Sequence, residues 1–355
     1  MRIIHLSPHC DEVGNGVVNV AVDLAITQRE AGHSVGLVSQ GGSMVKMLED
    51  HGVEHFCASM TLRHPAAMFA GFRSLSGVLS EFEPDIVHAH MVPGAVFARL
   101  LRRRFRFRLI TTVHNAPQPQ AVLMGLGDRV IVVSAANLKS MAQRGLSRHK
   151  LRLVKNGPLD SPRRPHSAGA IDRTVLRRPA IVSVARLFSQ KGIGDLIESF
   201  AVIAEAFPDA CLYFVGAGPE REKFEKKASE TGVAHRIHFV GFVKDPRCYL
   251  RQADIFVLAS HSDPFPLVIP EAREAGCAIV ATDVDGIREG LEEGRAGLLV
   301  PPSNPAALAK ELHRLLSDAG ELAAWRERAR TNLEWLRMGR VVTETLAIYK
   351  EALAS

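Results

Sequence analysis

Short runs of apolar residues alternate along the whole chain with longer segments of helical periodicity. Strands of a parallel sheet that is covered by helices are buried on both faces, so they read as continuous apolar runs. Helices are expected between the runs, for example over 17–31 and 93–101. The predicted strands are 3–6, 35–38, 86–89, 109–113, 130–133, 180–184, 211–215, 237–239, 255–258, 278–281 and 297–300.

The strands form two sets, and 355 residues are enough for two domains of ordinary size. Between the sets, N-G-P is a turn signal, and the Pro-, Ser- and Arg-rich tract after it has no periodicity. Two doubly wound α/β domains are therefore predicted, facing a central cleft where ligands bind at the carboxyl ends of the strands. The predicted boundaries are 1–157, a linker at 158–178, 179–337, and a C-terminal helix at 338–355 that packs back on the first domain.

The composition, with 46% hydrophobic and 23% charged residues, is typical of a globular protein. No run of eighteen apolar residues occurs, and the apolar stretch at the N-terminus is too short for a signal-peptide core. Five cysteines at positions 10, 57, 211, 248 and 277 form no C-x-x-C pair, which favours a reducing compartment over a disulfide framework or a zinc site. We therefore expect a cytoplasmic protein.

The net charge of +6 is unevenly distributed. Residues 1–170 contain 20 Lys and Arg against 12 Asp and Glu, whereas 171–355 contain 24 against 26. Much of the excess lies in A-R-L-L-R-R-R-F-R-F-R-L-I (98–110), which could contact an anionic membrane from the inner face. The alternative is a solvated helix end followed by a strand with outward arginines, and a nucleic-acid partner is not expected.

Four stretches of the second half carry candidate chemistry. They are S-V-A-R-L-F-S-Q-K-G (183–192), Y-F-V-G-A-G-P-E (213–220), H-F-V-G-F-V (238–243) and S-H-S-D-P-F-P-L-V-I-P-E-A (260–272). The fourth runs on into A-G-C-A-I-V-A-T-D-V-D-G-I-R-E (275–289) and G-L-L-V-P-P (297–302). Arg186 and Lys191 follow a predicted strand, and a pyrophosphate leaving group needs rigidly placed cations of this kind. The alternative for both residues is an ordinary surface salt bridge.

The glycine turn G-A-G-P-E lacks the third glycine of a dinucleotide fingerprint, because position 221 is Arg. Pro219 is expected at the first helical position, and Glu220 and Glu222 in the first turn would repel a phosphate. This turn is therefore interpreted as packing, and NAD is not expected.

The prolines of 260–272 shape a turn from strand to helix. Pro266 suits the first helical turn, which leaves the N–H groups of Leu267 and Val268 free to meet a phosphate. Pro270 stands about one turn further on, where it is expected to delay the regular helix.

His88, His90 and His114 lie at or just past strand ends, where a lone histidine is more often structural than catalytic. Neither an Asp-x-Asp motif nor a His/Asp cluster with convincing metal spacing is recognised, so no divalent metal is expected. Gly14 and Gly16, before the first helix, allow close approach of an anion, or simply cap that helix.

The order of these stretches resembles the donor-binding domain of retaining glycosyltransferases of family 4, which have the GT-B fold of two Rossmann-like domains. The resemblance is close over 180–302 and looser over 14–25, 32–35, 84–90, 112–115 and 133–139. It implies transfer of a sugar from a UDP- or GDP-sugar to an acceptor hydroxyl, in polysaccharide, lipopolysaccharide or glycolipid assembly, with a glycan or lipid-linked acceptor. It implies no cofactor. It also implies same-face attack, with the leaving phosphate helping to deprotonate the acceptor.

The resemblance also implies roles for individual residues of the second domain. Glu271 would bind the ribose hydroxyls, and Asp263, where the family usually has Glu, would face the donor sugar. Arg186, Lys191 and the backbone around Phe265, Pro266, Leu267 and Val268 would stabilise the diphosphate. The nucleotide base would lie near Gly241 and Val243.

In the first domain, which would bind the acceptor, His114 would contact the donor sugar and the Gly16 loop an anionic group. Asn15 interrupts the adjacent glycines that the family usually has in this loop.

Two alternatives remain open at the level of sequence. A nucleotide-sugar epimerase of the same fold would convert the donor without an acceptor. A non-catalytic glycan- or membrane-binding protein on this scaffold, which the Asp at 263 favours, would transfer nothing. The sequence does not name the sugar, the base, the acceptor, the linkage or the oligomeric state.

Overall fold

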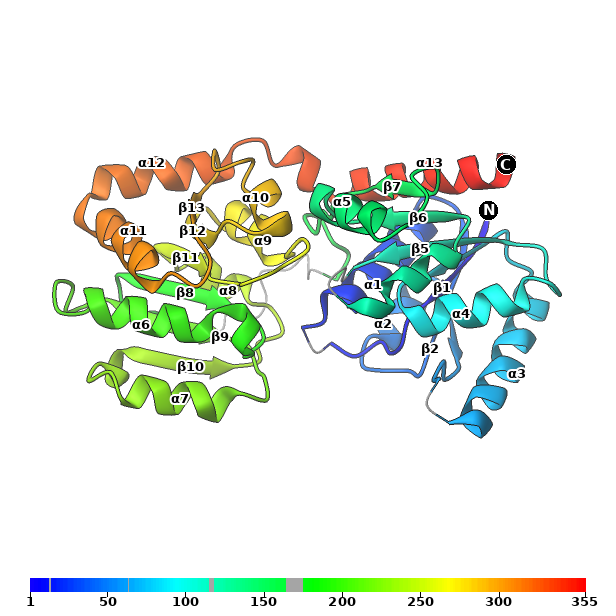
Figure 1. The fold of residues 1–355 in the computed structure, drawn as a ribbon, viewed down its shortest axis with the longest axis horizontal. Coiled ribbons are helices and arrows are strands. Elements are labelled where there is room, and N and C mark those ends of the chain that lie inside the picture. The colour runs from blue at the N-terminus through cyan, green and yellow to red at the C-terminus, as the bar shows by residue number, and fades with distance from the viewer. Residues whose placement is uncertain (13, 63, 115–117, 164–174) are drawn as a thin grey trace. The chain divides into compact units, whose positions relative to one another are not determined.

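The computed structural model describes the chain apart from residues 13, 63, 115–117 and 164–174 (Figure 1). The chain folds into two compact units, Met1–Arg164 with Leu336–Ser355, and Pro165–Trp335. Each unit is built on a parallel sheet flanked by helices, which confirms the predicted α/β doubly wound class. Among the described helices, none is both long enough and apolar enough to cross a membrane.

The first unit contains a seven-stranded sheet in the order β3-β2-β1-β4-β5-β6-β7. Its strands are β1 (Arg2–Leu6), β2 (Ser34–Ser39), β3 (Glu54–Cys57), β4 (Ile86–Ala89), β5 (Arg108–Val113), β6 (Arg129–Val132) and β7 (Leu151–Leu153). Its helices are α1 (Gly16–Glu30), α2 (Val45–Asp50), α3 (Pro65–Phe82), α4 (Val92–Leu101), α5 (Ala135–Gln143), α13 (Met338–Ala354) and the 3-10 helix η1 (Pro119–Leu126).

The second unit contains a six-stranded sheet in the order β10-β9-β8-β11-β12-β13. Its strands are β8 (Ala180–Val184), β9 (Cys211–Val215), β10 (Ile237–Gly241), β11 (Ile255–Leu258), β12 (Ala278–Thr282) and β13 (Leu298–Val300). Its helices are α6 (Ile193–Ile203), α7 (Arg221–Ser229), α8 (Arg247–Leu250), α9 (Val268–Ala275), α10 (Asp285–Gly290), α11 (Pro305–Ser317), α12 (Ala319–Arg330) and the 3-10 helices η2 (Ser189–Lys191) and η3 (Ala234–Arg236); a last one, η4 (Glu334–Leu336), stands at the unit boundary.

In each sheet the first strand in sequence lies in the interior, and the direction in which later strands are added reverses once. The reversal lies between β1 and β4 in the first unit and between β8 and β11 in the second. In open α/β sheets, ligands bind beside the carboxyl ends of the strands at such a reversal. The loops that follow these four strands are therefore the places to look for a site in each unit.

Two edge strands of the first unit, β3 and β7, have no counterpart among the predicted strands. Strand β3 reads E-H-F-C and is only partly buried at the edge of the sheet, so it shows no continuous apolar run. Strand β7 has three residues, L-R-L, too few for a periodic signal. Both edge strands are recognised only through their parallel pairing with β2 and β6.

The C-terminal helix α13 belongs to the first unit, where it packs against α1 and β5 (Figure 1). Part of the predicted linker, 164–174, lies outside the described residues. Just before it, Arg163 donates two hydrogen bonds to Asp23 of α1, at 2.7 and 2.9 Å. Just after it, Leu176 is buried in the core of the second unit.

Alternate residues of β1 and β4 point to opposite faces of the first sheet, because side chains in a strand alternate. On one face Ile4 and Val87 belong to an apolar cluster that includes residues of α3 and α4. On the other face His5 and His88, which are register partners, are fully buried. Buried polar side chains on one face of a sheet require hydrogen-bond partners there.

Candidate active site

The turn after β8 carries the two predicted cations of the second unit. Arg186 is exposed, and its guanidinium lies 4.7 Å from the ring centroid of Phe188. Lys191 ends η2, and Nζ of its side chain lies 2.5 Å from Oδ2 of Asp263. Lys191 and Asp263 are 72 residues apart in sequence, and they meet because β8 and β11 are neighbours at the reversal of the sheet.

Asp263 is almost fully buried, with 9% of its side chain exposed, against 28% for Lys191. Burial raises the pKa of Asp263, and the negative charge of Asp285 adds to that rise. The ammonium group of Lys191 opposes it through its charge and its hydrogen bond. Lys191 therefore stabilises the carboxylate form of Asp263.

The loop after β11 is fastened to the turn after β8. The N–H of His261 donates to the carbonyl of Gln190 (2.8 Å), and its Nε2 donates to Oδ2 of Asp195 (2.7 Å). A Cβ atom on Gly192 would lie 1.9 Å from the carbonyl oxygen of Ala259, so only glycine permits this approach. The two segments that carry Lys191 and Asp263 are thus held together by the backbone.

Asp285 and Gly286, at the start of α10, form hydrogen bonds with the backbone of Asp263. The N–H of Asp263 donates to Oδ2 of Asp285 (3.1 Å), and the N–H of Gly286 donates to the carbonyl of Asp263 (3.1 Å). A Cβ atom on Gly286 would lie 1.9 Å from the carbonyl oxygen of Pro264. From the sequence these two residues received no role, although D-V-D-G, an Asp-x-Asp motif that was overlooked, directly follows a buried strand.

The four residues 265–268 lead into α9. Phe265 is buried and lies edge-on to Trp335, with ring centroids 6.2 Å apart. The helix begins at Val268, with Leu267 as its N-cap, so Pro266 stands just before the helix and not in its first turn as predicted. Pro270 is the third helical residue, and the prediction that it delays the helix is wrong. An N–H in the first turn has no partner within the helix, so its loss there has no cost.

Glu271, half-buried, lies in the first turn of α9. The pKa of Arg247 in α8 is raised, mainly by its hydrogen bond to Asp245. The negative charges of Glu271 and Glu274 add to this rise. A carboxylate near a helix N-terminus is also stabilised by the helix dipole.

The glycine turn G-A-G-P-E packs against the Arg186 turn. Cβ atoms on Gly216 and Gly218 would lie 2.1 and 2.4 Å from the carbonyl oxygens of Ala185 and Leu187. These contacts agree with the interpretation of the turn as packing. Pro219 was misplaced as the first helical residue, because α7 begins at Arg221.

Glu220, at the N-cap of α7, fastens the same turn through its side chain. Its carboxylate accepts hydrogen bonds from the hydroxyl and the N–H of Ser189, the latter at 3.1 Å, and from Nζ of Lys223 at 3.0 Å. These bonds lower the pKa of Glu220 to about 2. Glu220 therefore positions the segment between Arg186 and Lys191, a role that the sequence analysis missed.

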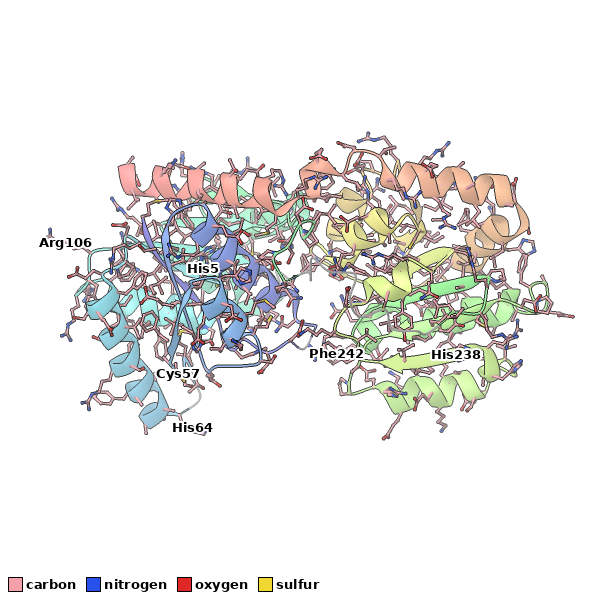
Figure 2. All side chains as sticks on the ribbon, turned by 180° about the vertical axis from the view of Figure 1, so that it is seen from behind. His5, Cys57, His64, Arg106, His238 and Phe242 are labelled. Atoms are coloured by element: carbon pink, nitrogen blue, oxygen red, sulfur yellow. The ribbon has the colours of Figure 1, made fainter. Side chains whose placement is uncertain are left out.

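Gly241 and Val243 lie at and just after the end of β10. Gly241 has a φ of +91°, and its carbonyl accepts the N–H of Gly216 at 2.7 Å. Val243 packs at the margin of the apolar cluster beneath β8, and Phe242 between them is exposed (Figure 2).

Gly16 is the first residue of α1, in the first unit, and is exposed. Asn15 is the N-cap, and its side-chain oxygen accepts the N–H of Val17 at 3.1 Å. The residue that interrupts the glycines thus takes the capping role that Asn commonly has.

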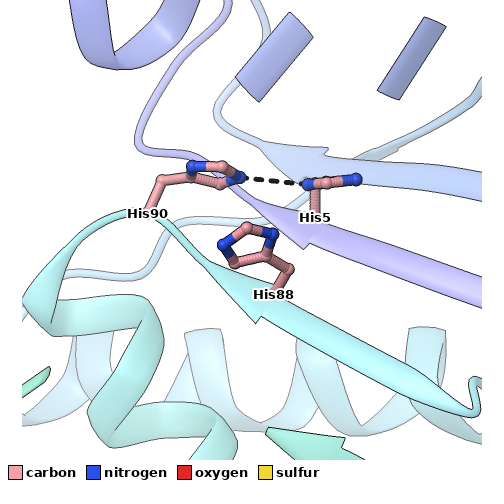
Figure 3. A group of neighbouring side chains, drawn as sticks. All are labelled: His5, His88 and His90. Atoms are coloured by element: carbon pink, nitrogen blue, oxygen red, sulfur yellow. Dashed lines mark hydrogen bonds between the residues drawn. The ribbon is translucent and has the colours of Figure 1, made fainter. Parts of the chain in front are cut away.

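His114 lies half-buried just past β5, and its Nε2 is 3.1 Å from Nδ1 of His90. Burial lowers the pKa of His114 to about 4, so its ring is neutral at neutral pH. His88 and His90 are fully buried, and ring nitrogens of these two residues and of His5 lie within 4.8 Å of one another (Figure 3). Sequence spacing missed this group because its members come from two strands.

Two family models match the chain, and between them they cover most of it. "Glycosyltransferase Family 4" matches residues 14–158, and "Glycosyl transferases group 1" matches residues 172–332. The two matches fall one on each unit of the fold.

Individual proteins agree with the models. Glycogen synthase of Mycobacterium tuberculosis is 26% identical over 384 residues, which cover 99% of this chain and 90% of that protein. The lipopolysaccharide core biosynthesis glycosyltransferase LpsE of Rhizobium meliloti is 31% identical over 153 residues, 42% of this chain and 44% of LpsE. The crystal structure of Anabaena HepE in complex with UDP and glucose superposes with a TM-score of 0.84 at 21% identity, over 100% of both chains. The chain therefore belongs to the group 1 glycosyltransferases, which are enzymes of the GT-B fold.

Proposed function

We propose that this enzyme moves a sugar from a nucleotide diphosphate sugar to an acceptor hydroxyl with retention of anomeric configuration. The observation that carries the proposal is the Lys191–Asp263 pair at the reversal of the second sheet, with Asp263 in the loop that leads into α9. A cation next to a helix N-terminus and free backbone N–H groups is suited to bind a diphosphate.

In this proposal Arg186, Lys191 and the backbone at 267–268 stabilise the negative charge that develops on the leaving diphosphate. Glu271 binds the ribose hydroxyls, and the segment from Gly241 to Val243 lies beside the base. Asp263 faces the transferred sugar, as does His114 of the first unit.

The reaction exchanges two bonds at the anomeric carbon on the same face of the sugar. The bond to the diphosphate oxygen breaks as the bond to the acceptor oxygen forms. The acceptor proton goes to an oxygen of the leaving phosphate, so no separate general base is required. Because protein cations neutralise the leaving group, the proposal requires no metal, and transfer should persist in EDTA.

The nature of the donor is supported by the structural neighbours. HepE was crystallised with UDP-glucose, and a point mutant of the S. aureus protein TarM with UDP. For this chain we propose a UDP- or GDP-sugar. The similarity to LpsE supports a role in lipopolysaccharide, polysaccharide or glycolipid assembly.

A basic surface on the first unit supports peripheral contact with an anionic membrane that carries the acceptor. Its exposed cations are Arg99, Arg103, Arg104 and Arg106, and Arg106 projects from the unit (Figure 2). Arg102 is not part of it, because its guanidinium lies 2.6 Å from Asp128.

The proposal is tested by a thermal-shift panel of UDP, GDP and their sugars, followed by transfer assays with the donor that stabilises the protein. The Arg186→Ala and Lys191→Ala variants should each lower transfer on the order of 10²–10³-fold. Lys226→Ala, which removes an exposed cation from α7, is the matched control. Normal transfer by both site variants would refute the assignment of the diphosphate, and turnover of the donor without acceptor would indicate an epimerase.

A further inference from the structure

Four histidines share one face of the first sheet. His5 and His88 are register partners on β1 and β4, His90 follows His88 by two residues, and His114 follows β5. Figure 3 shows His5 and His90 joined by a hydrogen bond, with the ring of His88 beside them. The ring centroids of His88 and His90 are 4.2 Å apart.

The order of hydrogen bonds along this face defines where each proton lies. The oxygen Oε1 of Gln28 can only accept, so the bond of 2.9 Å to His5 is donated by Nε2–H of His5. In a neutral imidazole the other nitrogen is then an acceptor. Nδ1 of His5 therefore accepts the proton on Nε2 of His90, at 3.0 Å.

The series of hydrogen bonds continues from His90 to His114. Nδ1 of His90 accepts the proton on Nε2 of His114, at 3.1 Å. His114 thus carries its proton on Nε2 and keeps the lone pair of Nδ1. Among the hydrogen-bonded residues Gln28, His5, His90 and His114, His114 alone is not fully buried. The hydrogen bonds therefore run from the core to a partly exposed side chain.

A second branch of hydrogen bonds is compatible with this orientation of the Gln28 amide. Nε2 of Gln28 donates to the hydroxyl of Tyr349 in α13, at 3.4 Å. That hydroxyl lies 2.6 Å from Nδ1 of His88, whose Nε2 lies 2.6 Å from Oγ1 of Thr112. With Tyr349 as donor to His88 and His88 as donor to Thr112, both branches are satisfied with every ring neutral.

Burial keeps the rings neutral. It lowers the pKa of His5 to about 4 and those of His88 and His90 well below the usual value. Because each ring has a single proton, a change of tautomer at one end requires a change at every ring. A metal ion would have to displace these bonds, since all six ring nitrogens of His5, His88 and His90 already have partners.

We propose that Gln28, His5 and His90 are positioning residues that hold His114 as the neutral Nε2–H tautomer. In this form the ring offers Nδ1 as a hydrogen-bond acceptor to a hydroxyl of the transferred sugar, a last step that rests on the function proposed above. A tautomer fixed in advance avoids the cost of reorganising a polar group when the substrate binds.

The first test is nitrogen NMR of the full-length protein with labelled histidine, at neutral pH. The expected result is a proton on Nε2 and none on Nδ1 of His114. A proton on Nδ1 would overturn the proposal and leave the proposed function untouched. If the tautomer is as expected but no donor is transferred, the hydrogen-bond chain is supported and the proposed function is not.

The second test uses variants at the two branches. Gln28→Met removes the acceptor of His5 at similar volume, so His114 should lose its single tautomer, and kcat/KM should fall about 10-fold, as for one lost hydrogen bond. Thr112→Val breaks only the branch of His88, so the His114 tautomer should be retained. An unchanged His114 spectrum in folded Gln28→Met would refute the role of Gln28.

A zinc titration of the wild type by calorimetry separates the hydrogen-bond chain from a metal site. No uptake is expected. Binding of one zinc ion per chain that is lost in His88→Asn would overturn the proposal in favour of a metal site.

Discussion

Nζ of Lys191 and Oδ2 of Asp263 lie 2.5 Å apart in the second unit, and the carboxylate is the more deeply buried of the two. The pair joins the turn after β8 to the loop after β11, the two segments that flank the reversal of the sheet. A buried carboxylate without its cation is costly, so this contact couples stability to the geometry of the proposed diphosphate site.

Replacement of Lys191 by Met should lower the free energy of unfolding by about 2–3 kcal/mol, because it leaves Asp263 buried and unpaired. The value is below that for a fully buried pair, since 28% of the Lys191 side chain is exposed. Urea unfolding of Lys191→Met, Asp263→Asn and the double variant measures the coupling. The double variant should lose less stability than the two single losses combined, and strict additivity would show that the pair is not coupled.

Replacement of Gly286 by Ala should displace the backbone at Pro264, because the new Cβ would lie 1.9 Å from its carbonyl oxygen. We expect a loss of about 2 kcal/mol in stability and weaker nucleotide binding, measured by urea unfolding and by titration of UDP. Gly77→Ala is the matched control in α3, where a Cβ meets nothing within 4 Å. It should stabilise the protein by about 0.5–1 kcal/mol. Equal effects of the two changes would contradict the role of Gly286.

Replacement of Glu220 by Ala should release Ser189 and loosen the turn between Arg186 and Lys191. The expected result is a fall in kcat/KM for the donor of about 10-fold, the size of one lost charged hydrogen bond. Glu222→Ala changes an exposed carboxylate in the first turn of the same helix and should transfer normally. If both variants behave alike, Glu220 does not position the turn.

Acidification should destabilise the first unit through its buried histidines. The pKa values of His5 and His114 fall from 6.5 to about 4 on folding, so between these values the unfolded chain binds protons that the folded chain does not. The free energy of unfolding is therefore highest above pH ~6.5. It decreases as the pH is lowered, by up to about 1.4 kcal/mol per pH unit for each histidine. Urea unfolding from neutral pH to about pH 4.5 measures the slope, and His114→Gln should reduce it. His64→Gln, which replaces an exposed histidine, should leave it unchanged, and a flat profile in the wild type would contradict the prediction.

Replacement of Arg103, Arg104 and Arg106 by Gln should weaken binding to vesicles that contain anionic phosphatidylserine. About 1 kcal/mol per arginine near the surface corresponds to roughly fivefold for each change at low salt. Lys310→Gln, on α11 of the second unit, should not alter binding. Failure of the wild type to sediment with these vesicles, or equal binding to neutral ones, would remove the support for a membrane role.

The apolar runs by themselves determined the two parallel sheets, because buried strands are continuous in sequence and their pattern is local. The order of the motifs around Arg186, Gly218 and Asp263 determined the family, because each motif is also a local pattern in the sequence. The start of α9 was harder to predict from the sequence, because Pro270 indicates an interruption of the helix until the boundary at Val268 is known.

Only the tertiary structure decided which side chains meet. Lys191 contacts Asp263 through the pairing of β8 with β11, and His5 contacts His90 through the pairing of β1 with β4. Tyr349 reaches His88 from a helix 261 residues away in sequence. Alternate polar residues in H-A-H and T-V-H indicate a polar face, but a local pattern contains no information on the strand or helix that covers it. The register of the sheets supplies that information, and with it the order of hydrogen bonds that ends at His114.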